Sequence, residues 1–347
     1  MLQSVEKRNV TIVDIAKAAG VSRAAVSLVL RAKPGVGADA RARVVTAMRE
    51  LGYVYNRGAA NLRQSRSSVV GMIINDLTNP FFAQLAVGIE RALSISGYMP
   101  FIANTAESVV RQADLMRSMR EHGAVGLILC PALDTAAEAL NELAAEYPLV
   151  LAVRRIAGAR VAVAVSENEL GARRATQHLL ALGHRRIGFV GGRSPAVVRN
   201  ERIAGYRGAL EAKAIAYDPA LAIESLPTRV GGIDAMNAAL TMAKRPTAFL
   251  CFNDVVAMGA MIAAERHGLK VGDDVAIVGF DDIAEASLAT PPLTTVAVNA
   301  EALGEHAARL LLDQIRGGSA AISSYVGDAR LVVRGSCGVK PNQRASQ

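Results

Sequence analysis

The spacing of apolar residues changes once along the chain, near residue 69. Between Thr11 and Leu51 they recur every three or four positions, as on one face of an amphipathic helix. From Val69 onward they form short continuous runs, such as VVGMII (69–74) and GLILC (126–130), separated by segments with helical spacing. Buried strands that alternate with helices are typical of a parallel sheet covered on both faces. The pattern predicts a small helical module followed by an α/β body.

Three helices are predicted in the small module. The first begins at a capping signature, Thr11 followed three residues later by Asp14. Gly20 allows a sharp turn, and Ser22 can cap a second helix. A third helix is predicted over residues 38–51, with Gly52 as its stop signal. The apolar residues that helical spacing directs into one shared core are Ile12, Ile15, Ala16, Ala19, Val26, Val29, Leu30, Val44, Met48 and Leu51.

The layout of the first two helices is that of a DNA-reading motif. Two short helices about a tight turn, the second with a free basic face, place a helix in the major groove. An ordinary helical hairpin is the alternative. Charge distinguishes the two, because residues 1–68 carry twelve Lys and Arg against four acids, while the rest balances at 27 against 27. A neutral body with one cationic module is typical of nucleic-acid binding, whereas a solubilising surface would spread its charge.

The segment between module and body has two open interpretations. Asn56 could cap one or two helical turns up to Leu62, and Ser and Arg residues follow. A helix this short is marginal in water and orders only when something holds it. A plain tether and a functional hinge therefore both fit the residues.

The body is predicted to form two similar α/β lobes, because it contains too many units for one modest sheet. A ligand would lie between the lobes, at the carboxyl ends of the strands. Strands are expected at 69–74, 99–103, 126–130, 149–153, 185–192, 247–252, 275–280, 293–298 and 330–333. Helices are expected at 82–96, 109–122, 135–146, 201–214, 255–267 and 300–316.

Composition excludes several classes of protein. No apolar run approaches membrane-spanning length, and the first thirty residues carry no signal-peptide core. The three cysteines lie far apart, without zinc or disulfide spacing, so we expect a cytoplasmic protein. The five histidines have neither metal spacing nor a neighbouring nucleophile, and no phosphate-binding loop occurs. We therefore expect no enzymatic activity, no catalytic residues, no metal and no cofactor.

Several motifs together resemble one protein family. They are VTIVDIAKAAGVSRAAVSLVL (10–30) and RARVVTAMRELGY (41–53), then VVGMIINDLTNPFF (69–82), HLLALGHRRIGFVGG (178–192), PTAFLCFNDVVAMGA (246–260) and VAIVGFDDI (275–283). The chain resembles the lac repressor (LacI/GalR) family of bacterial transcription regulators from about residue 10 to 339. The resemblance implies a helix-turn-helix headpiece, a hinge helix and a two-lobed core with parallel sheets, similar to periplasmic sugar-binding proteins. It also implies a homodimer or a dimer of dimers on a palindromic double-stranded operator.

This organisation gives expected domain boundaries. The DNA-binding domain covers residues 1–56, the hinge helix and linker 57–67, and the effector-binding and dimerisation core 68–347. Within the core, the first lobe comprises about 68–165 and 299–329, and the second about 166–298 and 330–340.

The resemblance also implies DNA-contacting residues. The positions that read bases in such repressors fall on Arg23, Ala24 and Leu28. Arg23 can donate two hydrogen bonds to a guanine, and Leu28 can contact a thymine methyl. Thr11, Ser22 and Ser27 are interpreted as phosphate contacts or helix caps. The hinge residues are Asn56, Ala59 and Leu62, of which Leu62 is the apolar wedge for the minor groove.

For a carbohydrate-like effector, the resemblance implies a cleft lined by Asn79, Phe81, Phe82 and Arg154 from the first lobe and by Arg202, Asn253 and Asp281 from the second. Such side chains suit vicinal hydroxyls and sugar C–H faces. Purely structural roles stay open: Asn79-Pro80 as a helix start, one of the two phenylalanines as core, and Asp254 as a helix cap.

The charge of the effector is a separate question. Val153 stands where sugar binders often carry an aspartate. If Arg154, Arg155, Arg199 and Arg202 converged on the cleft, a sugar acid or sugar phosphate would be favoured over a neutral sugar.

The sequence thus predicts a transcriptional regulator, most simply a repressor, whose operator affinity an effector controls from between the lobes. The alternative is a solute-binding protein of a sugar transporter. The absence of a signal peptide and the cationic headpiece argue against that alternative.

Overall fold

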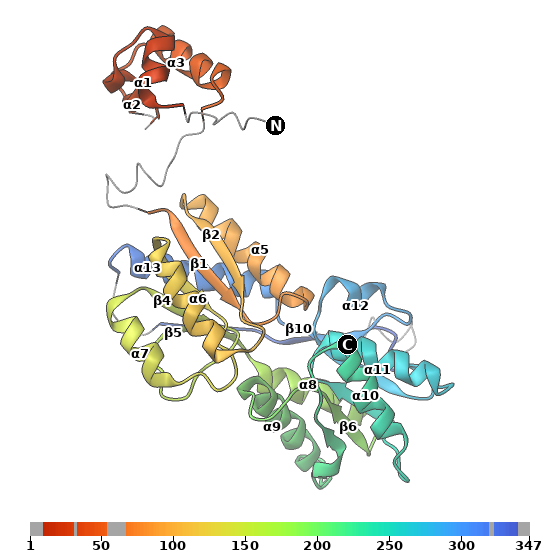
Figure 1. Cartoon of the computed structure of the whole chain (residues 1–347). Coiled ribbons are helices and arrows are strands. Elements are labelled where there is room, and N and C mark those ends of the chain that lie inside the picture. Colours follow the sequence, from red (N-terminus) through yellow and green to blue (C-terminus); the bar gives the residue numbers. More distant parts are fainter. Residues whose placement is uncertain (1–9, 31–32, 54–66, 319–322, 339–347) are drawn as a thin grey trace, which may run out of the picture. The chain divides into compact units, whose positions relative to one another are not determined.

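A computed structural model of the chain describes residues 10–30, 33–53, 67–318 and 323–338. The chain divides into two compact units, Met1–Ser67 and Ser68–Gln347, which are considered separately below (Figure 1). Within the described ranges, no helix combines the length and apolar character needed to cross a lipid bilayer.

The first unit contains the three expected helices, α1 (Ile12–Ala19), α2 (Arg23–Leu30) and α3 (Ala38–Glu50). The Thr11–Asp14 capping box is present, and Gly20 adopts the left-handed conformation with φ 61°. Ser22 Oγ accepts a hydrogen bond from the Ala25 N–H at 3.1 Å, so it begins α2 as predicted. The buried core consists of Ile15, Ala16, Ala19, Val26, Val29, Val44 and Ala47.

One core assignment in this unit is wrong. Leu51 is 37% exposed, although its spacing from Val44 and Met48 placed it on the buried face. The reason is that α3 ends at Glu50, and Leu51 is its C-cap with ψ −6°. The chain leaves the helix before Leu51 can continue the apolar stripe, and Tyr53 packs against the core instead.

The second unit is built on two six-stranded sheets. The first has the order β11-β5-β4-β3-β1-β2, and all its strand pairs are parallel. Its strands are β1 (Val69–Ile74), β2 (Met99–Asn104), β3 (Ala124–Leu129), β4 (Leu149–Ala152), β5 (Ala162–Ser166) and β11 (Ser324–Gly327). The chain passes between the sheets three times, after β5, after β10 and after β11.

The second sheet has the order β12-β10-β9-β8-β6-β7, and β12 runs antiparallel to β10. Its strands are β6 (Ile187–Val190), β7 (Ala222–Ile223), β8 (Ala248–Cys251), β9 (Ala276–Asp281), β10 (Thr294–Ala297) and β12 (Arg330–Val332). We call each sheet with its helices a lobe, the first lobe being that of β1.

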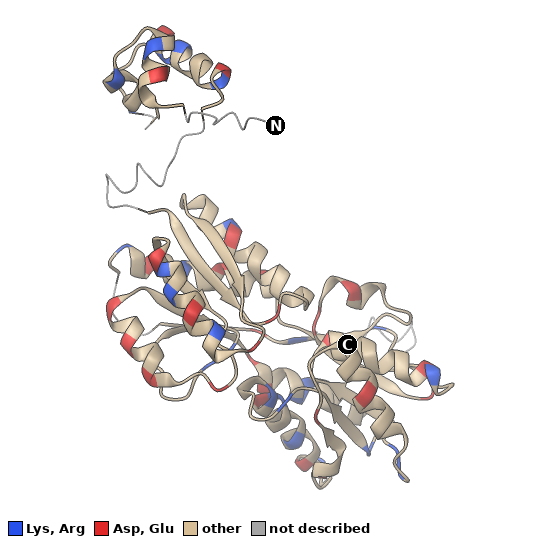
Figure 2. Cartoon of the chain, viewed as in Figure 1, with Lys and Arg blue, Asp and Glu red and all other residues tan. Residues whose placement is uncertain are grey.

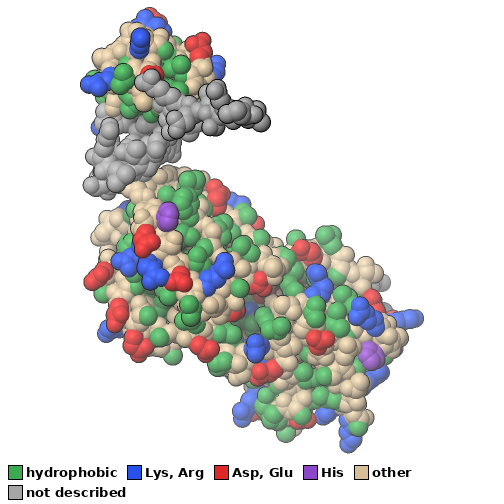
Figure 3. All heavy atoms as spheres, in the orientation of Figure 1, with side chains coloured by type: hydrophobic (Ala, Val, Ile, Leu, Met, Phe, Trp, Pro, Cys, Tyr) green, Lys and Arg blue, Asp and Glu red, His purple; other side chains and the backbone are tan. Residues whose placement is uncertain are grey.

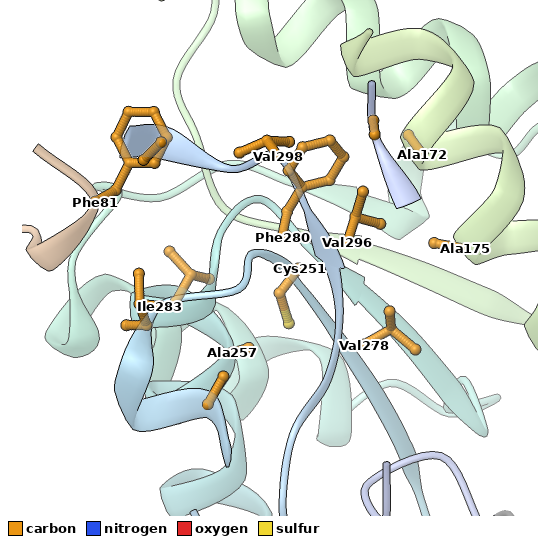
Figure 4. Close-up of a cluster of buried hydrophobic side chains, with 14 of the residues drawn as sticks. Phe81, Ala172, Ala175, Cys251, Ala257, Val278, Phe280, Ile283, Val296 and Val298 are labelled. Carbon is orange, nitrogen blue, oxygen red and sulfur yellow. The ribbon is translucent and has the colours of Figure 1, made fainter. Parts of the chain in front are cut away.

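Helices cover the sheets of both lobes (Figure 1). The first lobe has α5 (Pro80–Ile95), α6 (Val109–Glu121), α7 (Ala137–Glu146) and α13 (Ala300–Ile315). The second has α8 (Asn168–Ala181), α9 (Val197–Glu211), the 3₁₀ turn η1 (Pro219–Leu221), α10 (Arg229–Leu240), α11 (Asp254–Arg266) and α12 (Ala284–Leu288). One hydrophobic cluster extends through both lobes, and Figure 4 shows the part around Phe280, Val296 and Val298. The predicted α/β class is confirmed.

The predicted strands and helices are all present, with shifts at their ends, but the prediction omitted β5, β7, β11, α8, α10 and α12. The strand β5 reads AVAVS, and its small residues give a weak hydrophobic signal. Helix α10 contains Gly231-Gly232, which lowers helix propensity. These glycines serve close packing, because a Cβ on Gly232 would overlap the carbonyl oxygen of Val256 in α11.

A glycine also allows close packing between α8 and α9, and this contact gives a first testable prediction. A Cβ on Gly205 of α9 would overlap the carbonyl oxygen of Glu169, whereas on Gly208 it would meet only the flexible Arg173 side chain at 3.4 Å. We expect Gly205→Ala to lower the free energy of unfolding by about 1–3 kcal/mol or more, because backbone must move. Gly208→Ala should raise it by about 0.5–1 kcal/mol, through helix propensity. Urea titration followed by far-UV circular dichroism measures both, and equal effects would contradict the packing argument.

Candidate functional site

The first candidate site is the outer surface of α2. Arg23 and Ala24 are exposed, and Ser27 and Leu28 are half-buried. Leu28 lies beside the following loop, since a Cβ on Gly35 would be 3.7 Å from its Cδ1. Among the described residues, this surface therefore offers the Arg23 guanidinium next to small and apolar groups, a combination suited to a guanine edge and a thymine methyl.

Hydroxyl side chains cap both α1 and α2. Thr11 Oγ1 donates to Asp14 Oδ2 at 2.7 Å, and Thr11 N–H donates to the same oxygen at 2.8 Å. Thr11 and Ser22 thus have the predicted capping role, which orients the helices. The predicted hinge residues Asn56, Ala59 and Leu62 lie outside the described residues.

The charge of the headpiece and of the larger unit differs as predicted (Figure 2). In the headpiece, the described residues include Lys17, Arg23, Lys33, Arg41, Arg43 and Arg49 against Asp14, Asp39 and Glu50. On the face of the larger unit shown in Figure 3, cations and acids are interspersed. The net positive charge of the chain therefore lies in its first 68 residues.

The second candidate site is a cavity of about 450 Å³ in the larger unit, which we call the interlobe cavity. It is lined by residues that follow the carboxyl ends of strands in both lobes, where doubly wound sheets bind their ligands. All seven residues predicted for the effector line it: Asn79, Phe81, Phe82, Arg154, Arg202, Asn253 and Asp281.

On the first-lobe side, Asn79 begins α5. Its Oδ1 accepts a hydrogen bond from the Phe81 N–H at 3.0 Å, and Pro80 takes the first helical position. Phe81 and Phe82 pack edge to face, with ring centroids 5.2 Å apart. Both rings belong to the hydrophobic core and both line the cavity. Each phenylalanine is therefore a core residue and a cavity residue at once.

The prediction did not include Glu107, which dominates the polar part of this wall. Its Oε1 lies 2.5 Å from Arg154 Nη2, and its Oε2 accepts from Arg154 Nη1 at 2.9 Å. Burial opposes the charge of Glu107, but hydrogen bonds and the charge of Arg154, with further donors from Asn75 and Leu133, lower the pKa of this carboxyl. The position directly after β2, at the carboxyl edge of the sheet, was the available signal.

On the second-lobe side, Arg202 is held by several groups. Its Nη2 lies 3.5 Å from Asp281 Oδ1, its Nε donates to Asn168 Oδ1 at 3.1 Å, and its Nη1 donates to the Phe252 carbonyl. The guanidinium carbon lies 3.6 Å from the centroid of the Phe280 ring. Burial raises the pKa of Asp281 to about 7, although Arg202 favours the charged form.

Asn168 is a second residue that the sequence did not reveal. It is the first residue of α8, at the start of the first connection between the sheets, and it is buried. While its Oδ1 accepts from Arg202, its Nδ2 donates to Glu201 Oε2 at 2.8 Å. Asn168 therefore fixes Arg202 from the connection between the lobes.

Asn253 and Asp254 have roles different from those weighed in the sequence. Asn253 caps α11, because its Oδ1 accepts from the Val256 N–H at 2.9 Å. Asp254 is not the cap: its Oδ2 accepts from the Ile283 N–H at 2.9 Å, and its Oδ1 accepts from the Thr295 hydroxyl. Burial first, and then the charge of Asp281, raise the pKa of Asp254 well above its usual value.

The expected convergence of four arginines is wrong. Arg155 lines a separate hollow, and Arg199 is buried with its guanidinium on the carbonyl oxygens of Gly191 and Ala222, each at 3.2 Å. The charged residues that do line the interlobe cavity are balanced, with Arg154, Arg193 and Arg202 against Asp76, Glu107 and Asp281. Glu107 supplies the acid that Val153 does not, so the argument for an anionic ligand fails.

Family models match parts of both units of the chain. The family described as "Bacterial regulatory proteins, lacI family" matches residues 11–56, and the "Periplasmic binding protein-like domain" matches residues 176–337. The transcriptional regulator MalR of Streptomyces coelicolor is 36% identical, over 95% of this chain and 97% of its own. The repressor CytR of Escherichia coli is 31% identical, over 95% of this chain and 97% of its own.

Solved structures resemble the chain over most of its length. The lac repressor dimer bound to operator and the anti-inducer ONPF has a TM-score of 0.85 and 28% identity, covering 96% of this chain and 100% of that one. A CelR–cellobiose complex has a TM-score of 0.73 and 31% identity, covering 94% and 100%.

The curated relatives are transcriptional regulators, which supports the prediction that the chain is not an enzyme. The transporter alternative is not favoured, because the match includes the DNA-binding headpiece. The chain therefore belongs to the lacI family of bacterial regulatory proteins.

Proposed function

We propose that the chain is a transcriptional repressor whose affinity for a palindromic operator is set by an uncharged, carbohydrate-like molecule in the interlobe cavity. The observation that carries this proposal is the cavity itself, whose polar walls come from both lobes and whose charges balance. Relatives support the ligand class. They include a ribose operon repressor of Haemophilus influenzae, and a structural neighbour from Enterococcus faecium holds bound ribose.

On the DNA side, α2 of each protomer of a homodimer enters the major groove of one half-site. Arg23 reads a guanine, and Ala24 and Leu28 contact apolar base edges, while Thr11, Ser22 and Ser27 orient the helix on phosphates. The hinge role that the family resemblance implies for Asn56, Ala59 and Leu62, with Leu62 as the minor-groove wedge, is part of this proposal. The proposed domains are residues 1–56, 57–67 and 68–347, in a protein that acts in the cytoplasm.

On the effector side, the two lobes divide the recognition of a ligand. The Arg202–Asp281 pair and the Asn253 amide provide donors and acceptors for vicinal hydroxyls from the second lobe. Phe81 and Phe82 offer aromatic surface to sugar C–H groups from the first. A ligand that contacts both walls favours one arrangement of the lobes over another.

The regulatory step is a coupling between this cavity and the hinge. A ligand that favours one lobe arrangement by about 3 kcal/mol changes operator affinity about a hundredfold. The linker joins the headpiece to β1 of the first lobe, so a change in the first lobe alters the separation of paired hinge helices and their ability to fold on DNA.

A thermal-shift screen on the full chain tests the ligand class. Matched pairs, such as ribose with ribose 5-phosphate and glucose with gluconate, separate charge from shape. We expect a neutral sugar to raise the melting temperature, since a ligand at about 100 times its Kd adds about 2.7 kcal/mol to the free energy of unfolding. The Arg207→Met variant, changed on the exposed face of α9, should respond like the wild type. Protection by the anionic member of each pair alone would contradict the proposal.

A further inference from the structure

We propose that Glu107 determines the charge specificity of the interlobe cavity, by neutralising Arg154 and so excluding anionic ligands from the first-lobe wall. This inference rests on the proposed function, because it concerns the ligand of the same cavity. The family resemblance described above implies no role for Glu107.

The carboxylate of Glu107 is fully engaged. Its Oε1 accepts from Asn75 Nδ2 and from Arg154 Nη2, each at 2.5 Å. Its Oε2 accepts from Arg154 Nη1 and from the Leu133 N–H, each at 2.9 Å. Since Asn75 follows β1, Leu133 follows β3 and Arg154 follows β4, one side chain ties together three loops at the ligand edge of the sheet.

The backbone around Glu107 is shaped for this contact. Ala106 and Glu107 both have left-handed conformations, with φ 50° and φ 61°. Residues with a Cβ rarely adopt this conformation, and two in succession persist only where the surroundings hold them. Ser108 then caps α6 by accepting from the Arg111 N–H at 3.2 Å. The turn between β2 and α6 thus directs a carboxylate onto Arg154.

Among the described first-lobe residues that line the cavity, Arg154 is the one cation, and the ion pair with Glu107 removes its attraction for an anion. The Arg154 side chain is 12% exposed, and its Nη1 also donates to the Pro131 carbonyl at 2.8 Å. Because both of its terminal nitrogens are engaged, the guanidinium cannot form a bidentate pair of hydrogen bonds with a phosphate or carboxylate. Without Glu107, the same guanidinium would be a poorly solvated cation lining the cavity, which an anion could neutralise.

Asn75 provides a second, independent indication of ligand charge. It is 3% exposed and lines the cavity, and its Oδ1 has no hydrogen-bond partner among the described residues. The amide cannot be reversed, because its NH₂ group must face the Glu107 carboxylate. A buried, unpartnered acceptor favours a ligand that donates a hydrogen bond. A sugar hydroxyl donates, whereas a carboxylate or a fully deprotonated phosphate group only accepts.

The test compares wild type, Glu107→Gln and the double variant Glu107→Gln/Arg154→Met, with inorganic phosphate as the probe. Melting temperatures are measured in phosphate and in sodium chloride of equal ionic strength. We expect a phosphate-specific increase for Glu107→Gln that is absent from both other proteins. The double variant carries the same headpiece, so it removes any contribution from phosphate bound to the DNA-binding surface.

Two further variants keep the test decisive if Glu107→Gln does not fold. Glu107→Ala also removes the charge and should respond to phosphate, whereas Glu107→Asp keeps the charge and should not. Ribose 5-phosphate should gain about tenfold in affinity relative to ribose in the uncharged variants, the value of one charge-assisted hydrogen bond. An equal phosphate response in wild type and Glu107→Gln, or a response that survives Arg154→Met, would overturn the inference. Because the phosphate response needs no sugar, failure of the proposed effector class would be seen separately in the sugar screen.

Discussion

Arg202→Met is expected to lower the free energy of unfolding of the larger unit by about 3–5 kcal/mol, the typical effect of removing one partner from a buried ion pair. Arg202 and Asp281 are each 6% exposed, so water cannot replace the lost cation. The variant leaves Asp281 either as an uncompensated charge or with a bound proton. It also removes a wall of the interlobe cavity, and binding of the neutral sugar should be lost with it.

The loss of stability in Arg202→Met should increase as the pH rises. The pKa of Asp281 is about 7 with Arg202 present, and removing the cation raises it further. The folded variant therefore holds a proton that the unfolded chain has already released, and raising the pH from 5 to 8 costs it stability. The wild type, in which Arg202 supports the charged form, should lose less over the same interval.

Arg207→Met is the matched control, on the same helix and with the same change of side chain. Arg207 pairs with Glu211 on the exposed surface, and its side chain is 58% exposed. Exposed pairs of this kind contribute little to stability, because solvent screens them. Since the chain has no tryptophan, urea titration followed by far-UV circular dichroism is the appropriate measurement. Equal losses in the two variants would show that the buried pair has no special role.

Arg23→Ala is expected to weaken binding to the best operator by about 1–3 kcal/mol, roughly ten- to a hundredfold, and to relax specificity at one base pair per half-site. The side chain is exposed at the start of α2, so the fold should not change. The operator is first obtained by selection from random duplexes, and affinities are then measured by fluorescence anisotropy against operator and a scrambled sequence.

Arg49→Ala is the corresponding control, since Arg49 is an exposed cation in the last turn of α3. The Arg49→Ala variant should lose a small and equal amount of affinity for both duplexes, because the substitution changes only the electrostatic attraction to phosphates. If Arg23→Ala behaved in the same way, with no change in base preference, the reading role of α2 would be wrong.

The headpiece could be predicted closely because its signals are local. Thr11, Asp14 and Gly20 determine α1 through contacts within a few residues, and such contacts are visible in the sequence. Leu51 was misplaced because helical spacing does not show where a helix ends. In the larger unit, Gly231-Gly232 concealed α10, since Gly232 allows close packing against α11 and Gly231 allows close approach of the Leu226 carbonyl.

The cavity residues could also be predicted only in part, because some of their contacts come from distant parts of the chain. The resemblance placed seven residues on its walls, and all seven line it. What it could not supply were the partners of those residues. Glu107 reaches Arg154 from 47 positions away, and Arg199 points to backbone carbonyls that only the folded chain brings near. The charge of the site depends on such pairings, so counting arginines in the sequence could not establish it.

The most direct test of regulation is the operator affinity of the full chain with and without the neutral sugar that raises its melting temperature. Anisotropy titrations at fixed salt, repeated at saturating sugar, give the coupling as a ratio of two dissociation constants. The account predicts a change of at least about tenfold, corresponding to a coupling of about 1.4 kcal/mol or more. An unchanged operator affinity at saturating sugar would contradict it.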